Sequence, residues 1–268
     1  MIDHGARNVL GVRVSAVDYE FAVDKIIESA KAGRRCTTSA LAVHGVMTGA
    51  LDAAHRYRLN HLDLVVPDGR PVCWALNLLY GAGLRDVVFG PKLTGLLCAE
   101  AARQGISVYF YGSTEETLEK LGPNLLQRFP GLIIAGLEPS KFRRLSDQEQ
   151  LEVADRIRQS KAGILFAGLG CPRQEVFAYE MGNLLSMPIL AVGAAFDYHA
   201  GLLKDSPPFL ERLGLRWLHR LVQEPRRLWR RYLVTNTQFV ALFLAQWLHL
   251  WKPDLNRTTP PGENHRFG

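Results

Sequence analysis

The sequence predicts an α/β fold built on a Rossmann-like, mostly parallel sheet with helices on both faces. β-rich and helical segments alternate about six times along the chain, which is typical of that class. Residues 163–168 and 188–193 are continuous apolar runs rather than alternating ones, as in central strands covered on both sides. Hydrophobic residues make up 47% of the 268 positions and charged residues 22%, so the chain can bury a large core without disulfides or metals.

Each element follows from local sequence signals. The first half predicts, in order, a strand at 8–14, a helix at 19–33, a strand at 35–39, a helix to about residue 60, a strand at 62–66 and a helix from residue 71. The second half predicts a helix at 91–104, a strand at 106–112, a helix at about 114–129, a strand at 132–136, a helix at 146–162 and the two apolar strands. Asp18 is the expected cap of the first helix, and Ser146 with Glu149 forms a capping box.

The carboxyl ends of the predicted strands select the loops where a ligand would bind. In open parallel sheets, ligands bind at this edge. The loops are residues 38–45, 67–69, 112–114 and 168–175, with Phe196 and Asp197 as a fifth. We expect Gly69, Gly112 and Gly170 on these loops to bind substrate, since glycine lets a ligand approach the backbone.

The character of the chain changes at Pro207. We expect a Rossmann-like core at residues 1–206, an arginine-rich helical appendage at 207–252 and a polar, proline-rich, disordered tail at 253–268. Residues 212–231 contain seven arginines and one acid, so this stretch accounts for the whole net charge of +6. Because arginine's planar fork suits phosphate, the cluster predicts a phosphate or lipid partner, although a solvated helix face needs no partner at all.

The apolar residues beside the arginines favour a membrane surface over nucleic acid. Residues 237–251 are too short and too interrupted to span a bilayer, which takes about 20 apolar residues. Arginines, tryptophans and leucines in one helical region are typical of a segment that lies on anionic lipid. Nucleic acid is not an expected partner, because the apolar stretch would have no role there.

The sequence predicts neither a metal site nor a cofactor. The four cysteines are irregularly spaced without a CxxC pair, and HxxxH, HExxH and DxD spacings are absent. The N-terminus lacks the basic and apolar regions of a signal peptide. We therefore expect a reduced, cytoplasmic protein that lies peripherally on the inner face of a membrane.

Two loops carry the residues best suited to chemistry. Asp68 ends a strand at the ligand edge and could act as a general base toward a hydroxyl, or form an Asx-type turn before Gly69. Residues 168–175 open a helix whose N-H groups suit phosphate, with Gln174 and Glu175 positioned to bind hydroxyls. The alternative for this loop is a tight turn with Pro172 at the first helical position.

Further candidates lie at the same edge. Asp197 follows the last strand and could accept hydrogen bonds from a ribose or base, or cap the next turn. His44 and His199 also lie there, and a structural role is the simpler interpretation of both. Arg173 occupies the position of the third glycine of GxGxxG, which argues against a nicotinamide-dependent oxidoreductase.

Taken together, these motifs resemble the WecG/TagA/CpsF family of bacterial glycosyltransferases. The order PDG, GPxL, GLGCPRQE, VGAAFDYHAG and LGLRWLHRLVQEPRRLWRRY carries the resemblance, over roughly residues 8–245. The resemblance implies an inverting, metal-independent transfer of a sugar from a UDP-sugar to a polyprenyl-diphosphate-linked acceptor in cell-surface or exopolysaccharide synthesis. It also implies a C-terminal appendage that meets the membrane.

The resemblance also assigns roles to particular residues. It implies that Asp68 is the general base, that Gln174 lies near the reacting groups and that Asp197 lies near the nucleotide. The arginines implied to neutralise the diphosphate are Arg220, Arg226 and Arg227.

The chain departs from the family pattern at several positions. Val87 stands in place of the arginine of ERVxGPDL, and Lys92 in place of its second acid. Arg216 replaces the acid of the usual EW, Asp205-Ser206-Pro207 replaces RAP, and residues 37–45 lack a clear TxN motif. The sequence therefore leaves open a catalytically silent, membrane-associated partner that binds nucleotide sugars, and self-association through the apolar appendage.

Overall fold

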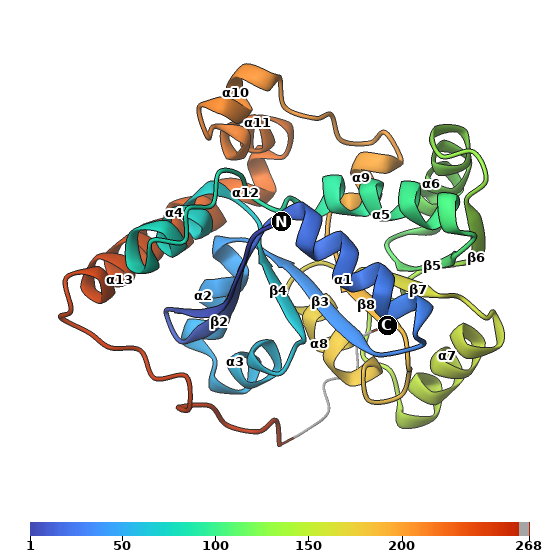
Figure 1. Ribbon diagram of the computed structural model, residues 1–268, viewed down its shortest axis with the longest axis horizontal. Coiled ribbons are helices and arrows are strands. Elements are labelled where there is room, and N and C mark those ends of the chain that lie inside the picture. The colour runs from blue at the N-terminus through green and yellow to red at the C-terminus, as the bar shows by residue number, and fades with distance from the viewer. Residues whose placement is uncertain (263–267) are drawn as a thin grey trace.

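The computed structural model describes residues 1–262 and 268, except for the side chains of residues 208, 212, 227 and 231. Its centre is a six-stranded sheet in which all paired strands are parallel (Figure 1). The strands lie side by side in the order β4 (Leu64–Pro67), β3 (Cys36–Leu41), β8 (Pro188–Ala191), β7 (Ile164–Gly168), β5 (Ser107–Gly112) and β6 (Ile133–Glu138). This confirms the predicted α/β, Rossmann-like architecture.

Helices cover both faces of the sheet, each over its own apolar core. One face carries α1 (Tyr19–Lys31), α5 (Gly90–Gln104), α6 (Glu115–Arg128) and α9 (Ala195–His199). The other carries α2 (Val43–Leu51), α3 (Ala53–Asn60), α4 (Arg70–Tyr80), α7 (Asp147–Gln159) and α8 (Arg173–Met181). Successive strand residues alternate between the two cores, so Phe110 packs in one and Tyr111 in the other. Both faces are buried, which explains the continuous apolar runs.

The prediction of a single strand at residues 8–14 is wrong, because the chain reverses inside that segment. β1 (Asp3–Val9) and β2 (Val12–Val17) form a separate antiparallel hairpin. Leu10 and Gly11 at the turn have φ angles of 55° and 89°, as a two-residue type I′ turn requires. The alternating pattern continues through the turn and hides the reversal.

The predicted helix reaching residue 60 is two helices. Asp52 ends α2 and caps α3, since its carboxylate accepts hydrogen bonds from the backbone of Ala54 (2.8 Å) and His55 (3.0 Å). The predicted caps elsewhere are confirmed: Asp18 accepts from the Phe21 backbone, and Ser146 forms its capping box with Glu149.

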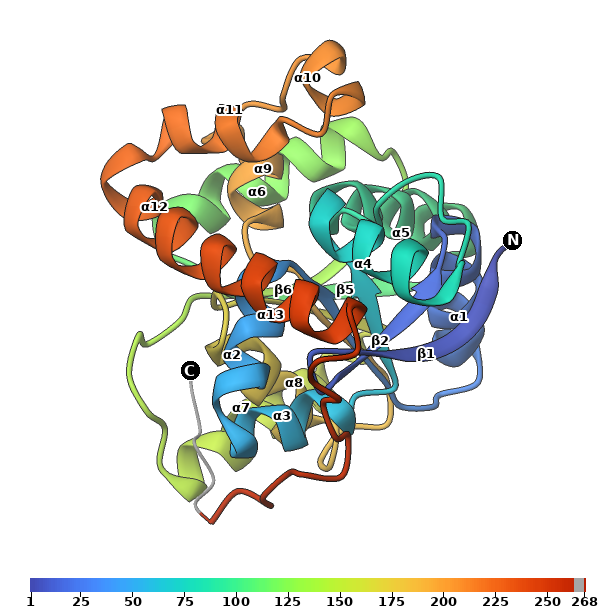
Figure 2. The same cartoon turned by 90° about the vertical axis from the view of Figure 1, so that its left-hand side faces the viewer.

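The C-terminal region is helical and lies against the core in two parts (Figure 2). The short helices α10 (Pro208–Arg212), α11 (Arg216–Gln223) and α12 (Pro225–Arg231) lie beyond the carboxyl edge of the sheet. A π-helical turn, η1 (Tyr232–Asn236), then leads into α13 (Thr237–Trp247), which packs on α2 and α4. None of the described helices has the length and apolar character needed to cross a bilayer.

Helix α13 is attached to the core by two buried side chains. Phe239 is 3% exposed and packs in the core of the α2 face. The Gln246 amide donates to the Asn8 carbonyl (2.8 Å), and its oxygen accepts from the Leu10 backbone (3.0 Å). The segment expected to lie on lipid therefore has one face committed to the protein.

The segment after α13 has neither helix nor strand over residues 253–262. It runs beside α3, where the Thr259 backbone donates to the Ala53 carbonyl and the Asn8 side chain donates to the Pro253 carbonyl. Residues 263–267 of the predicted disordered tail lie outside the described part of the chain.

We predict that Gln246→Met loosens α13. The substitution leaves the buried Leu10 N-H without its acceptor, at a cost of about 1–3 kcal/mol in the free energy of unfolding, while the Asn8 carbonyl keeps its bond from the Tyr80 hydroxyl. Urea unfolding and limited proteolysis measure the effect. Gln238→Met, on the exposed side of the same helix, is the matched control. Equal stability of the two variants would contradict the anchoring role.

Candidate functional site

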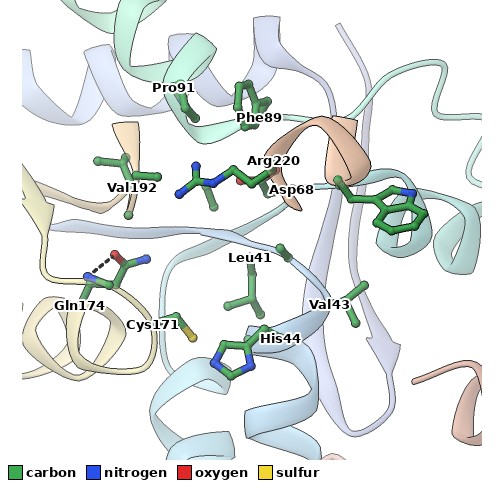
Figure 3. Close-up of a pocket in the computed structure, with 18 of the residues that line it drawn as sticks. Leu41, Val43, His44, Asp68, Phe89, Pro91, Cys171, Gln174, Val192 and Arg220 are labelled. Atoms are coloured by element: carbon green, nitrogen blue, oxygen red, sulfur yellow. Dashed lines mark hydrogen bonds between the residues drawn. The ribbon is translucent and has the colours of Figure 1, made fainter. Parts of the chain in front are cut away.

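A cavity of about 740 Å³ lies at the carboxyl edge of the sheet (Figure 3). The loops after β3, β4, β7 and β8 line one side of the cavity, and the C-terminal appendage lines the opposite side. The lining includes residues 40–45, 68–71, 168–171, 173–175, 192–194 and 197–198 from the core, and Glu211, Gly214, Arg216, Trp217, Arg220, Leu228, Tyr232, Thr235 and Asn236 from the appendage. The ligand edge predicted from the strand ends is therefore the cavity edge.

Asp68 lies among these loops and is held from two sides. Its backbone N-H donates to the Leu41 carbonyl at the end of β3 (3.1 Å). Its Oδ2 accepts from the Gly90 backbone at the start of α5 (3.3 Å). Among the described residues its carboxylate accepts this bond from α5 and none from its own turn, so the arrangement differs from an Asx turn.

The surroundings of Asp68 adjust its acidity in two directions. Burial raises the pKa of its carboxyl to about 6, because the charged form loses hydration. The Gly90 hydrogen bond and the charges of Arg216 and Arg220 lower the pKa and limit that rise. The carboxyl is consequently ionised at neutral pH and is a stronger base than an ordinary aspartate.

Gln174 and Glu175 brace the loop after β7. The Gln174 oxygen accepts from the Gly170 backbone (3.1 Å), the bond dashed in Figure 3, and its amide donates to Glu175 (2.9 Å). Ser39 donates to the same Glu175 oxygen (3.2 Å), which joins β3 to this loop. Both side chains line the cavity and are almost fully buried. They therefore form part of the cavity wall.

Of the remaining predicted residues in the core, Gly69, Gly170 and Asp197 line the cavity and Gly112 does not. A Cβ at Gly112 would lie 2.8 Å from the Gly168 backbone, and φ is +116°. Gly112 therefore lets the ends of β5 and β7 approach, and Ser113 and Thr114 beyond it reach the cavity.

The two predicted arginines whose side chains are described, Arg220 and Arg226, differ in position. Arg220 lines the cavity near Asp68, bonded to Glu224 and lying over the Tyr198 ring at 5.4 Å (Figure 3). Arg226 is exposed and is absent from the described lining. The Arg227 side chain lies outside the described residues.

Arg216 is the cavity residue that sequence reasoning undervalued. Its guanidinium lies 3.9 Å from the centre of the Phe89 ring and is paired with Glu211 at 2.6 Å. It lies on the cavity wall, as does Val87, the position where the family pattern has an arginine. The two residues that depart from the family pattern therefore line the same cavity. The sequence shows both departures, but it does not show that they lie in one site.

The two histidines differ in their surroundings. His44 lines the cavity from the first turn of α2. His199 contacts the Pro91 carbonyl through Nε2 (2.9 Å), and burial lowers its pKa. The structural interpretation suits His199, whereas His44 faces the ligand space.

Comparison with known proteins agrees with this geometry. The model of the glycosyl transferase WecG/TagA/CpsF family matches residues 7–253. The chain belongs to this family. The matched range includes the parallel sheet and the C-terminal helices α10 to α13.

Two curated relatives have the same name, N-acetylglucosaminyldiphosphoundecaprenol N-acetyl-beta-D-mannosaminyltransferase. The chain is 32% identical to the protein of Bacillus spizizenii and 26% identical to that of Bacillus subtilis. Each alignment covers 65% of this chain and 66% of the relative.

We predict that Gly112→Ala disturbs the cavity wall through the backbone contact with Gly168. Overpacking of this kind costs about 1–3 kcal/mol. Gly105→Ala is the control, because φ is +67° there but a Cβ meets nothing within 4 Å. Thermal unfolding should show the larger loss of stability in Gly112→Ala. Equal losses would mean that backbone strain alone, about 1–2 kcal/mol, explains both.

Proposed function

We propose that this protein is an inverting glycosyltransferase that moves a sugar from a UDP-sugar to a polyprenyl-diphosphate-linked sugar acceptor. The observation that carries the proposal is the half-buried carboxylate of Asp68 facing a cavity that Arg216 and Arg220 also line. A base beside cations suits a reaction in which a hydroxyl loses its proton and a diphosphate departs. The acceptor class follows the printed names of the relatives.

In the proposed reaction, Asp68 removes the proton of an acceptor hydroxyl. The resulting oxygen attacks the anomeric carbon of the donor, and a new carbon–oxygen bond forms as the bond to UDP breaks. The electron pair leaves with UDP, and the configuration inverts because attack and departure occur on opposite faces. Asp68 then releases its proton to water.

Charge builds on the diphosphate as it leaves and must be stabilised. Arg216 and Arg220 line the cavity, and so do residues at the N-termini of α6 and α8, where the helix dipole is positive. Removal of one such donor typically costs about 3 kcal/mol in transition-state stabilisation. These groups supply the positive potential that transfer requires.

The appendage also supports a membrane-bound position on the cytoplasmic face. Large apolar side chains are exposed there, namely Phe209, Leu213, Trp217, Leu218, Val222, Trp229, Leu233 and Val234. Arg226 and Arg230 are exposed among them. Apolar and cationic groups together suit anionic lipid, and they would bring the cavity to a lipid-linked acceptor.

A second candidate is a catalytically silent partner that binds nucleotide sugars. The buried Val87 on the cavity wall favours it, because the family pattern has a cation at this position. Both candidates bind UDP, but only the glycosyltransferase transfers sugar and releases UDP.

The deciding experiment incubates the detergent-solubilised full chain with a panel of UDP-sugars and a polyprenyl-diphosphate-sugar, with Mg²⁺ and Mn²⁺ omitted. We expect acceptor-dependent UDP release with a matching gain in lipid mass. Calorimetric titration with UDP shows whether the protein binds the nucleotide. UDP binding without release across the panel would favour the silent partner, and absence of UDP binding would overturn both candidates.

We predict that Asp68→Asn folds normally and transfers sugar about 10²–10⁴-fold more slowly, the usual contribution of a general base. UDP release measures the rate, and circular dichroism checks the fold. Asp155→Asn, on the exposed side of α7, is the control with the same chemical change. Near-normal transfer by Asp68→Asn would contradict its role as base.

We also predict an acid limb in the pH profile of kcat/KM with a midpoint near 6. A base must be ionised, and a carboxyl with a pKa of about 6 is protonated below that pH and ionised above it, so activity rises with pH. In Arg216→Gln the limb should move to higher pH, because the Arg216 charge lowers the pKa of Asp68. A limb that stays in place would contradict this coupling.

A further inference from the structure

Three metal-ligating side chains from distant parts of the sequence meet behind the cavity wall. They are His55 of α3, Cys171 of the loop after β7, and Glu175 in the first turn of α8. One ligand atom of each lies within 4.8 Å of the other two. Cys171 and Glu175 also line the cavity, so the cluster lies between α3 and the ligand space.

Two of these side chains are buried with an atom that has no partner among the described residues. His55 is 3% exposed and Glu175 is 1% exposed. His55 Nε2 and Glu175 Oε2 form no hydrogen bond there. Buried polar atoms are nearly always paired, and leaving one unpaired costs about 1–3 kcal/mol. The Cys171 side chain interacts with the Glu175 carboxyl. A ligand held by all three side chains would also give His55 Nε2 and Glu175 Oε2 a partner.

The donor types of the cluster suit a cation as that partner, because imidazole nitrogen, thiolate sulfur and carboxylate oxygen are all metal ligands. The neighbouring Arg58 is paired with Glu180 (3.8 Å). The other Glu175 oxygen is held by Gln174 and Ser39, both neutral donors. His55 Nε2 and Glu175 Oε2 therefore share one buried site, beside the Arg58–Glu180 ion pair.

We propose that His55, Cys171 and Glu175 bind a Zn²⁺ ion through Nε2, Sγ and a carboxylate oxygen. Nitrogen, sulfur and oxygen donors of these types are the ligands that zinc takes in proteins, at about 2.0–2.3 Å. Such bonds bring the ligand atoms to about 3.5 Å from one another, which small side-chain rotations achieve from the separations observed. Binding converts the Cys171 thiol to a thiolate and releases its proton to solvent.

The consequence is a link between α3 and the loop that carries Gln174. Three protein ligands leave the fourth position of a tetrahedral ion open to water, and two of the three, Cys171 and Glu175, line the cavity. The site adjoins the N-terminus of α8, one of the groups that we assign to the departing diphosphate, because Glu175 lies in the first turn of that helix. It stands independently of the proposed transfer, since its donors and their burial make no reference to a substrate.

The test measures zinc on the purified full chain without any assay of transfer. After dialysis against an equimolar amount of Zn²⁺, we expect one zinc per chain by plasma mass spectrometry. Replacement by Co²⁺ should give the charge-transfer absorption of a thiolate ligand. Less than one tenth of a zinc per chain, or a cobalt spectrum without the thiolate band, would overturn the proposal and leave a bridging water as the shared partner.

Matched variants locate the site. Cys171→Ser and His55→Gln should each weaken zinc binding at least tenfold. Cys36→Ser, a buried thiol outside the cluster, and His61→Gln, at the end of the same helix, should bind as the original chain does. Zinc should also raise the melting temperature of the original chain and both controls, but not of the cluster variants. Equal binding by all four variants would place any zinc elsewhere and overturn the assignment.

Discussion

The burial of one carboxylate at the carboxyl edge of the parallel sheet is the constraint on which the site depends. Asp68 is fixed by hydrogen bonds to the end of β3 and the start of α5, so its position is set by the sheet itself. Burial raises the pKa of its carboxyl, and the Gly90 hydrogen bond and the charges of the cations Arg216 and Arg220 limit the rise to about 6. The carboxyl is therefore ionised near neutral pH but more basic than an ordinary aspartate.

Those cations come from the appendage, so the chemistry of the core depends on how the C-terminal helices dock. α11 carries Arg216 and Arg220 over the cavity, and the chain beyond it returns to the core through α13. The buried Phe239 and Gln246 hold that return segment. One face of the appendage therefore packs against the core. Its exposed apolar and arginine side chains face outward, and we propose that they contact a membrane.

Local sequence signals predicted most of the elements and failed where two signals coincided. The alternation over residues 8–14 is real, but Leu10 and Gly11 reverse the chain within it. The apolar periodicity to residue 60 is also real, but Asp52 offers a better cap than the helix interior and divides it. In both places a turn or a helix cap formed by one or two residues interrupts an element. The hydrophobic pattern on either side is longer and does not reveal the interruption.

The sequence by itself determined the fold class, the ligand edge and the candidates Asp68, Gln174 and Asp197, because periodicity and strand ends are local properties. Only the tertiary structure decided which side chains share the cavity. It brought Arg216 to the same cavity as Val87 and left Arg226 exposed. It also gathered His55 with Cys171 and Glu175, a set that no spacing motif detects. The physical reason is that these contacts depend on the packing and rotation of whole helices, which no short stretch of sequence specifies.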